Sequence, residues 1–452
     1  MKIIVGGAGS VGQSILDFLV RGNNDITIID NDSRTLNEVS QKYDILPVLG
    51  SVSHPDVLEK AGTAKADLLI AATDGDEVNL VACQVAHSEF QVRSAIARIG
   101  SRSFLNPLWN TLFGDHAIPV DLIISPDIAI AEDIMRLLKF PGALQAYPFF
   151  EKKLYLIGVK IEVNCPLLNT ELKNVSRVAP TLEASIVNII RRGKSFVPGL
   201  EDSFELGDEV YFLAMSEQIL EAVREFGQER PGIERVVIFG GNDIALALAR
   251  QLEKDDNIVS CKIVVEDYKE AKALATELNT ASVINGPMMS DDILREAGID
   301  NADAAIAVTE QDKDNLLVSL LSGQAGVKTN ISLVNTPSYN NLVDNVGDSI
   351  LVDRSSVTVS GILKEIRKTS MIRAYSLNRG LAEIWEIRLD EDTVGEGMSP
   401  AELKLPEGCR ICACLRDEEI SFPDEKQRLV PGDVIVLYLD SKAVKRIERI
   451  FA

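Results

Sequence analysis

Two stretches half a chain apart carry nearly the same pattern, and this internal repeat constrains the fold more than any single motif. Residues 2–16 read KIIVGGAGSVGQSIL and residues 235–248 read RVVIFGGNDIALAL. In both copies a strand, an acidic residue, a strand, a glycine, a strand and a Thr-acidic pair follow in the same order. The offset is 233 residues from Gly7 to Gly240 and 236 from Asn79 to Asn315. The repeat therefore predicts one duplicated unit with small insertions.

Short apolar segments alternate with amphipathic helical patterns, such as Ser10–Arg21 and Asn79–Ala86, in the first copy. This alternation predicts βαβ units and a parallel sheet. Six strands in roughly 125 residues make a complete doubly wound, dinucleotide-binding fold. The expected strands are Ile3–Val5, Ile26–Ile29, Ile45–Val48, Leu68–Ala71, Ala95–Ala97 and Leu122–Ile124.

The second copy repeats the same α/β pattern, and one helix is expected after each parallel sheet, at Ile128–Lys139 and at Thr358–Arg367. The expected strands of this copy are Val236–Phe239, Ile263–Val265, Ala281–Ile284, Ala304–Ala307, Ile331–Val334 and Ile350–Val352.

A smaller β-rich unit follows each parallel sheet. In the first of these units we expect strands at Leu154–Ile161, Ala184–Ile190 and Glu209–Ala214, then a helix at Glu217–Phe226. Similar turns precede an apolar strand in both units, with Gly207 and Gly432 offset by 225 residues. The predicted divisions are a Rossmann-like domain at 1–126, a crossover helix at 127–146, a small α+β domain at 147–228, a second Rossmann-like domain at 233–354, a second crossover helix at 355–370 and a second small domain at 371–452.

Composition excludes several classes of function. The 452 residues carry a formal net charge of −22, which argues against binding to nucleic acid or to anionic lipid. No run approaches the roughly 18 apolar residues of a membrane-spanning helix, and the chain enters a strand directly without a signal-peptide pattern. We therefore expect a soluble, cytoplasmic protein.

The cysteines and histidines offer little material for a metal site. Cys409, Cys412 and Cys414 are closely spaced, but the segment around them reads as a half-buried strand, and no second ligand cluster accompanies it. A structural role is favoured over a metal site. The three histidines, His54, His87 and His116, are scattered through the chain.

The loop Gly7–Gly12 (GAGSVG) lies between a predicted strand and a predicted helix, where a dinucleotide fingerprint belongs. Gly7 permits the tight turn, Gly9 lets the backbone approach a pyrophosphate, and Gly12 lets the helix pack on the strand. Asp30 ends the second strand and can bind ribose hydroxyls, which favours NAD over NADP and also suits ATP or ADP. The alternative is a glycine turn in a domain without a ligand.

Further polar residues end the other strands of this sheet, at the edge where open α/β sheets bind ligands. Gly50-Ser51 ends the third strand and Thr73-Asp74 ends the fourth. Thr73 and Asp74 can contact a ligand or cap a helix. Arg98 ends the fifth strand and can meet a phosphate, although a surface salt bridge is an equal alternative.

The second copy departs from the fingerprint. Asn242 stands at the second glycine position, where its side chain takes up space for a pyrophosphate, and Asp243 adds negative charge. Ala245 is tolerated at the third position. We expect weaker, altered or absent nucleotide binding there. The matching residues are expected to be Glu266 for Asp30, Gly286 for Gly50, Thr309-Glu310 for Thr73-Asp74, and Asn335 for Arg98.

These segments together resemble the TrkA family, the cytosolic regulatory subunits of bacterial Trk potassium-uptake systems. In the first half the resemblance is carried by KIIVGGAGSVG, Asp30, LGSVSHPDVLEKAG, DLLIAATDGDEVN and ISPDIAIAEDIMR. In the second half it is carried by NGPMMSDDILREAGIDNADAAIAVTEQDKDN and ILVDRSSVTVSGILKEIRK. The resemblance covers essentially the whole chain.

The resemblance implies a non-catalytic protein with tandem RCK (KTN) nucleotide-binding domains, each followed by an RCK C-terminal domain. It would bind NAD(H), or ATP or ADP, form a homotetramer, and lie on the inner face of the membrane against a potassium-translocating subunit of the TrkH or TrkG type. Ligand binding would shift the population of ring arrangements and so gate the membrane subunit. The residues implied in binding are Gly7, Ala8, Gly9, Ser10, Val11, Asp30, Gly50, Ser51, Thr73, Asp74 and Arg98, with Gly240, Gly241, Asn242, Asp243, Ile244, Glu266, Thr309, Glu310 and Asn335 in the second half.

Two enzymes are the alternatives. An NAD-dependent oxidoreductase needs a proton-transfer group, but the small β-rich units contain no histidine. A methyltransferase also uses a glycine loop and an acidic residue after its second strand. Neither activity explains duplication of the whole unit.

Overall fold

The structure is a computed structural model that describes residues 1–20, 24–114, 117–228, 230–335, 349–366, 370–377, 381–395, 397–423 and 427–451. Contacts divide the chain into two units, Met1–Ala129 with Arg354–Ile366, and Ile130–Asp353 with Arg367–Ala452. His116 and the predicted helix end at Arg367 lie outside the described residues. The domain boundaries given above stay a prediction.

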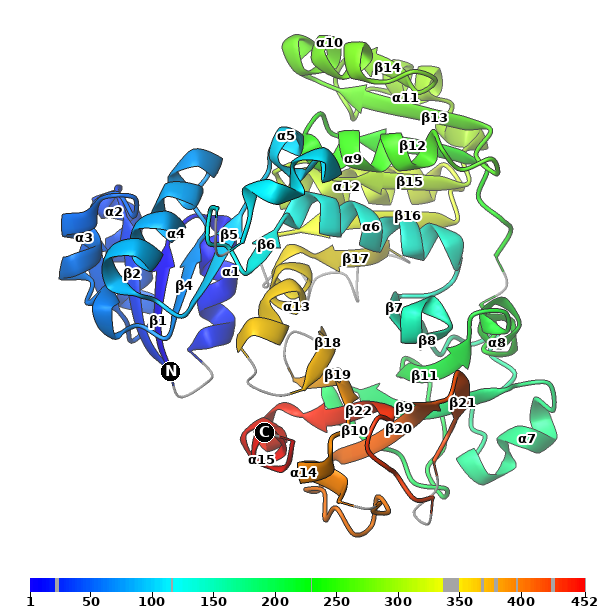
Figure 1. Cartoon of the computed structure of the whole chain (residues 1–452). Helices are drawn as coiled ribbons and strands as arrows, with labels where there is room; N and C mark the ends of the chain where they lie inside the picture. Colours follow the sequence, from blue (N-terminus) through cyan, green and yellow to red (C-terminus); the bar gives the residue numbers. More distant parts are fainter. Residues whose placement is uncertain are drawn as a thin grey trace. The chain divides into compact units, whose positions relative to one another are not determined.

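The first unit is built on a six-stranded parallel sheet in the order β3-β2-β1-β4-β5-β6 (Figure 1). This order is that of a doubly wound dinucleotide-binding fold, and it confirms the predicted fold class. All six strands lie within two residues of their predicted bounds. They are β1 (Lys2–Gly6), β2 (Asp25–Asp30), β3 (Leu46–Leu49), β4 (Leu68–Ala71), β5 (Ser94–Arg98) and β6 (Leu122–Ile124). The helices between them are α1 (Ser10–Leu19), α2 (Ser33–Lys42), α3 (Pro55–Lys60), α4 (Asp76–Phe90) and α5 (Arg102–Leu105).

Helix α13 (Arg354–Ile366) comes from the second half of the sequence but packs in the first unit. It contacts α1, and its Ile362 is fully buried in the same apolar core as Val11 and Ile15. The helix begins four residues before the predicted start at Thr358, because it follows β17 with no loop between them. Conversely, α6 (Pro126–Lys139) leaves β6 and belongs to the second unit from Ile130 onward.

The second unit contains the other parallel sheet, with the same strand order, β14-β13-β12-β15-β16-β17. Its strands are β12 (Arg235–Phe239), β13 (Ser260–Val265), β14 (Ser282–Asn285), β15 (Ala304–Ala307), β16 (Thr329–Val334) and β17 (Ser349–Asp353). Its helices are α9 (Asp243–Leu252), α10 (Tyr268–Glu277), α11 (Asp291–Ala297) and α12 (Asp312–Gln324).

Two five-stranded antiparallel sheets complete the second unit, in the orders β10-β9-β11-β8-β7 and β18-β19-β22-β20-β21. The first comprises β7 (Gln145–Phe149), β8 (Leu154–Lys160), β9 (Ala184–Arg191), β10 (Lys194–Phe196) and β11 (Glu209–Met215), with α7 (Val175–Val178) and α8 (Ile219–Glu225). The second comprises β18 (Met371–Leu377), β19 (Ala382–Arg388), β20 (Cys409–Arg416), β21 (Glu419–Ser421) and β22 (Val434–Asp440), with α14 (Glu391–Val394) and α15 (Val444–Ile450).

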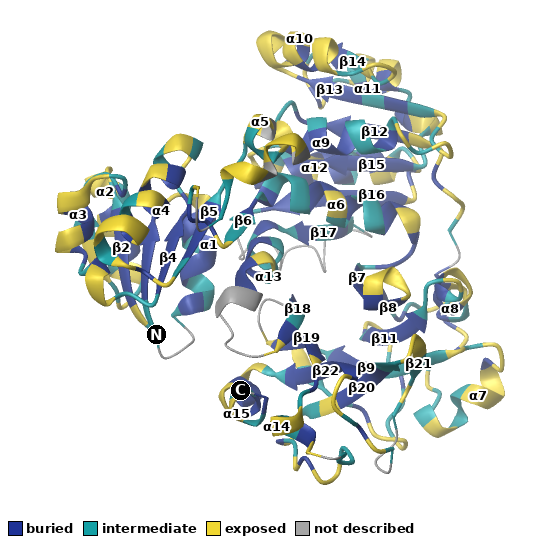
Figure 2. Ribbon diagram, viewed as in Figure 1, coloured by how far each residue is buried: buried dark blue, intermediate teal, exposed yellow. Residues whose placement is uncertain are grey.

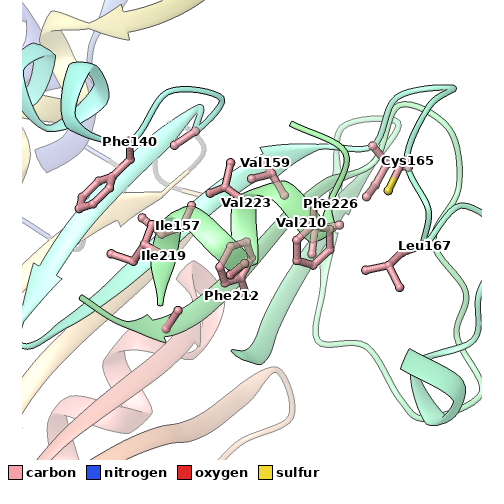
Figure 3. Close-up of a cluster of buried hydrophobic side chains, with 14 of the residues drawn as sticks. Phe140, Ile157, Val159, Cys165, Leu167, Val210, Phe212, Ile219, Val223 and Phe226 are labelled. Atoms are coloured by element: carbon pink, nitrogen blue, oxygen red, sulfur yellow. The ribbon is translucent and has the colours of Figure 1, made fainter. Parts of the chain in front are cut away.

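Each face of the first antiparallel sheet is buried. Helix α8 packs one face through Ile219, Val223 and the following Phe226, which stacks on Phe212 at 4.9 Å between ring centroids (Figure 3). The opposite face shares a core with the second antiparallel sheet. Burial is therefore nearly continuous along the central strands (Figure 2).

The clustered cysteines lie on the predicted strand. Cys412 and Cys414 are buried on β20, and burial raises the pKa of each thiol to about 12. Such thiols stay protonated and pack as small apolar groups. Among the described residues, no group of His, Cys, Asp and Glu side chains is placed to hold a metal ion, and no helix is long and apolar enough to cross a membrane.

Candidate nucleotide-binding site

The glycine loop of the first unit lies at the carboxyl edge of its sheet, where the strand order reverses between β1 and β4. Gly7 has φ +101°, and a Cβ there would come 2.7 Å from the carbonyl oxygen of Ala72. A Cβ on Gly12 would come 1.9 Å from the carbonyl oxygen of Gly7. Both glycines are required by the backbone geometry itself, because these contacts are too short for any side chain.

The start of α1 is open where a phosphate would bind. A Cβ on Gly9 would meet no atom within 4 Å, so the loop has free space at this residue. Gly9 is the N-cap of α1, no side chain caps the helix, and its first turn holds no acidic residue. The exposed N–H groups and the positive end of the helix dipole therefore offer a site for an anion. Ser10 and Val11 form the first turn of this helix.

Asp30 lies directly against the glycine loop. Its Oδ2 accepts a hydrogen bond from the backbone N–H of Ala8 at 2.6 Å, and its Oδ1 accepts one from Asp32 at 2.8 Å. A carboxylate held at the end of β2, beside the loop, is placed as the ribose-binding residue of a dinucleotide fold would be.

Gly50 and Ser51 end the neighbouring strand β3. The N–H of Gly50 donates to the carbonyl oxygen of Asp30 at 2.8 Å, and its φ of +148° favours glycine. Ser51 Oγ lies 2.9 Å from Ser53 Oγ. These residues shape the rim of the site beside Asp30.

Thr73, Asp74 and Arg98 are held together at the ends of β4 and β5. The Thr73 backbone N–H and hydroxyl donate to Asn79 Oδ1 at 3.0 and 2.7 Å. Arg98 Nη1 lies 2.6 Å from Asp74 Oδ1, so Arg98 has an ion-pair partner at the site.

Asn79 is a site residue that the sequence reasoning did not assign. It is fully buried, and its amide donates to the carbonyl oxygens of Thr73 and Arg98 at 3.0 and 2.9 Å. It thereby fixes the spacing between the ends of β4 and β5. Its recurrence at Asn315, with the same bonds to Thr309, was the signal that could have identified it.

The corresponding loop of the second unit is closed by its own side chain. Gly240 keeps a positive φ of +130°. Asn242 caps α9: its Oδ1 accepts from the Ala245 N–H at 3.2 Å, and its Nδ2 donates to the Val308 carbonyl at 2.6 Å and to Glu310 Oε1 at 3.3 Å. The end of this helix is therefore occupied. Gly241 is also crowded, since a Cβ there would come 2.5 Å from Glu270 Oε2, and Asp243 and Ile244 start α9.

The expected match between Glu266 and Asp30 is wrong by one residue. The N–H of Gly7 bonds to Ile29 in the first unit, and the N–H of Gly240 bonds to Val264 in the second, so Val265 takes the place of Asp30. Glu266 comes one position later, and its Oε1 accepts from the Met288 N–H at 3.0 Å. Gly286 does match Gly50, because its N–H bonds to Val265.

The expected match between Asn335 and Arg98 is wrong by two residues. Asn315 donates to the carbonyl oxygen of Leu333 as Asn79 does to that of Arg98, so a fully buried leucine takes the place of the arginine. The Asn335 N–H bonds to Asp312, as that of Gly100 does to Asp76. Single-residue differences in loop length shift the alignment by up to two positions.

Comparison with known proteins agrees with the duplicated fold. The TrkA-N domain family matches residues 3–126 and 236–353, and the TrkA-C domain family matches residues 384–452. The chain belongs to the TrkA family. As a TrkA-family protein, it is a non-enzymatic component of potassium uptake, and the oxidoreductase and methyltransferase alternatives are set aside.

Similar proteins match this TrkA-family chain over its whole length. The Trk system potassium uptake protein TrkA of Azorhizobium caulinodans is 34% identical, and that of Vibrio alginolyticus is 35% identical; each match covers 100% of this chain and 98% of the relative. Among solved structures, the GsuK RCK domain superposes with a TM-score of 0.63 at 18% identity, covering 99% of this chain and 94% of that one. The GsuK channel bound to NAD gives 0.62 at 18% identity, covering 99% and 78%. These likenesses confirm the expected RCK fold.

Proposed function

We propose that this TrkA-family chain binds NAD(H) in its first Rossmann-like domain, with ADP or ATP as competing ligands, and thereby regulates a potassium-translocating membrane subunit. One observation carries the proposal: the Asp30 carboxylate lies 2.6 Å from the Ala8 nitrogen, beside an uncapped helix end. A ribose donor and a pyrophosphate acceptor site are thus adjacent. That a GsuK channel has been solved bound to NAD, and another GsuK structure bound to ADP, supports these ligand classes.

Each part of the site has a distinct role in the proposed complex. The pyrophosphate would lie over Gly9 and accept hydrogen bonds from the first N–H groups of α1. Asp30 would accept hydrogen bonds from the ribose hydroxyls, and its charge would repel a 2′-phosphate, which favours NAD over NADP. Arg98 would exchange its pairing with the exposed Asp74 for a phosphate.

We further propose that the second Rossmann-like domain does not bind a dinucleotide in this way. Val265 removes the ribose acceptor, Leu333 removes the cation, and Asn242 occupies the helix end. The negative charges of Asp243 and Glu310 add repulsion. The expected stoichiometry is one tightly bound nucleotide per chain, and the conserved Thr309–Asn315 bonds then serve to hold the strand ends.

Regulation would follow from linkage between binding and assembly. The chain would form homotetramers, on the cytoplasmic face of the membrane, with a membrane subunit of the TrkH or TrkG type. Helix α1 starts in the glycine loop and packs on α13, which is continuous with β17 of the second unit. A nucleotide that binds one arrangement of the ring more tightly shifts the population toward it by the ratio of its affinities.

The test combines binding with transport. Full-length protein is titrated with NADH, NAD, ADP, ATP and S-adenosylmethionine by calorimetry, and potassium flux is measured with the membrane subunit in proteoliposomes. We expect saturable binding of NADH near one per chain, no turnover, and a nucleotide-dependent flux. Saturating nucleotide that leaves the flux unchanged would refute the regulatory role even if binding is observed.

A further inference from the structure

The two small domains of this chain pack about a local pseudo-twofold axis. Tyr147 on β7 and Tyr375 on β18 hold equivalent positions, opposite Leu156 and Ile384 on the next strand. Their rings lie 4.7 Å apart between centroids. Equivalent residues that contact each other lie at a twofold axis, so the two domains form a dimer-like pair inside one chain.

The strand positions next to this axis differ between the two copies. On the first sheet Gln145 lies opposite Gly158, and on the second Arg373 lies opposite Glu386. In the first copy the ring of Tyr211 fills the space over Gly158, because a Cβ there would come 2.9 Å from the ring, and its hydroxyl donates to Gln145 at 2.9 Å.

In the second copy the strand neighbour of Glu386 is Val436, where the first copy has Tyr211 opposite Gly158. An apolar side chain thus replaces a hydrogen-bonded phenol, and a carboxylate replaces a glycine. Duplication alone would have kept the two sides alike. The pair Arg373–Glu386 is therefore an acquired asymmetry of the shared core.

The Glu386 carboxylate is poorly accommodated as an anion. Its residue is 4% exposed. Oε1 accepts one long hydrogen bond, 3.3 Å from the Phe150 N–H, and Oε2 lies 3.7 Å from Arg373 Nε with no hydrogen bond in the described part of the chain. Buried carboxylates are normally fully hydrogen-bonded, because an unsatisfied buried charge is costly.

The donor to Glu386 belongs to a strained turn of the other small domain. Phe150, Glu151 and Lys152 have consecutive φ values of 48°, 56° and 73°. Left-handed backbone costs a non-glycine residue about 1–2 kcal/mol. The turn is thus held by its contacts, and it is poised to change when the contact with Glu386 weakens.

We propose that Glu386 is a proton-operated contact between the two small domains, which holds the turn at Phe150–Lys152 when protonated and releases it when ionised. Four groups face the carboxyl: Arg373 and Tyr375 from β18, Arg388 from β19 and Glu151 from the turn. The two arginines favour the ionised form, and Glu151 opposes it. Burial is the largest influence and raises the pKa of Glu386 above its ordinary value.

The direction of the pH effect follows from that shift. A carboxyl whose folded-state pKa is raised stabilises the fold most at low pH, and this contribution is lost as pH rises through the folded-state pKa. The contact is therefore tightest at acidic pH and loosens on the alkaline side.

The test is hydrogen exchange of residues 146–153 in the full chain between pH 5 and 8.5, corrected for the chemical exchange rate. We expect protection of this segment in the wild-type chain to fall by about tenfold across the transition, the equivalent of one pKa unit. In Glu386→Gln, a neutral isostere, protection should stay high and independent of pH. Glu419→Gln, on an exposed strand of the same domain, is the matched control and should behave as wild type.

A second variant keeps the test decisive if Glu386→Gln folds poorly. Arg373→Gln removes the nearest cation, so the transition should move to higher pH by about half a unit or more, whereas a purely structural role of Arg373 would lower protection at every pH alike. Identical pH profiles for the wild-type chain and Glu386→Gln, or an unmoved transition in Arg373→Gln, would overturn the proposal.

Discussion

The carboxylate of Asp30 accepts a hydrogen bond from the backbone N–H of Ala8 at 2.6 Å, which joins the end of β2 to the glycine loop. In the second unit the matching strand position is Val265, and no such bond can form there. This single difference separates a nucleotide-type site from a structural copy of it. It also leads to the first of five predictions.

Replacing Asp30 with Asn should weaken NADH binding about 10- to 100-fold, because a charged hydrogen-bond acceptor contributes about 1.5–3 kcal/mol. Calorimetry on the full chain measures the change. Asp32→Asn is the matched control, since Asp32 only caps α2 and Asn caps a helix as well. Equal affinities for wild type and Asp30→Asn would show that the ribose does not bind here.

The glycines of the loop should divide into two classes. Gly9→Ala meets open space, so the variant should fold normally but lose nucleotide affinity as the methyl group enters the phosphate site. Gly12→Ala should instead destabilise the first unit by about 1–3 kcal/mol or more, because its Cβ overlaps the Gly7 carbonyl oxygen. Thermal unfolding and calorimetry on both variants measure this. A Gly12→Ala protein with wild-type stability would contradict the close packing of α1 on β1.

Removing the self-cap of the second loop should not create a second site. Asn242→Gly should cost only a few tenths of a kcal/mol, whereas Asn242→Ala should cost about 0.5–2 kcal/mol. In both variants the stoichiometry should remain one nucleotide per chain, because Val265 and Leu333 still replace the ribose acceptor and the cation. A second binding equivalent in Asn242→Gly would show that the cap alone blocks the site.

Glu253 should control part of the acid stability of the second unit. Its carboxylate accepts from the backbone N–H groups of Asn279, Thr280 and Ala281 at 2.7, 2.6 and 3.0 Å. Burial opposes ionisation, but these bonds prevail and lower the pKa of Glu253 from 4.5 to about 2. A lowered pKa means that its stabilisation is present above pH 4.5 and is lost as pH falls toward 2.

Glu253→Gln should therefore cost about 1.5–3 kcal/mol at pH 7, and the difference from wild type should shrink below pH 4.5. Urea unfolding at several pH values measures it. Glu277→Gln, which removes an exposed partner of Arg250, should change stability by less than about 1 kcal/mol. A pH-independent difference for Glu253→Gln would mean that its charge is not what holds the loop.

The ion pair between Arg354 and Asp127 should stabilise the attachment of α13 to the first unit. Arg354 Nη1 lies 3.4 Å from Asp127 Oδ1, and the arginine side chain is 5% exposed. Arg354→Met leaves a carboxylate without this cation and should cost about 3–5 kcal/mol, whereas Arg354→Met with Asp127→Asn should recover part of the loss. Differential scanning calorimetry follows the unfolding transition. If the double variant is no more stable than the single one, the two residues do not act as a pair.

Local sequence was sufficient for much of the fold. The apolar runs around Ile3, Leu68 and Ala304 became the predicted parallel strands, because a strand buried on both faces needs a continuous apolar stretch. Gly7 and Gly12 could be assigned from their spacing, since no other residue fits the turn between strand and helix. Asp30 followed from its place at the end of the second strand.

The second site could not be read correctly from the repeat alone. Aligning Glu266 with Asp30 and Asn335 with Arg98 assumed constant loop lengths, but hydrogen-bond register decides which side chains share a position. A shift of one residue replaces the acidic residue with Val265, which points to the other side of the strand from Glu266. The start of α13 was also missed, because Arg354 and Ser355 carry no strong helix signal.

The internal repeat, its strand order and the first glycine loop were determined by the sequence itself, because apolar periodicity and glycine spacing act over a few neighbouring residues. Only the tertiary structure decided that α13 packs on the sheet of the other half, that Val265 and Leu333 empty the second site, and that Glu386 meets the turn at Phe150. These relationships join residues far apart in the chain. They depend on register and packing, in which one inserted residue changes the partner of every side chain that follows.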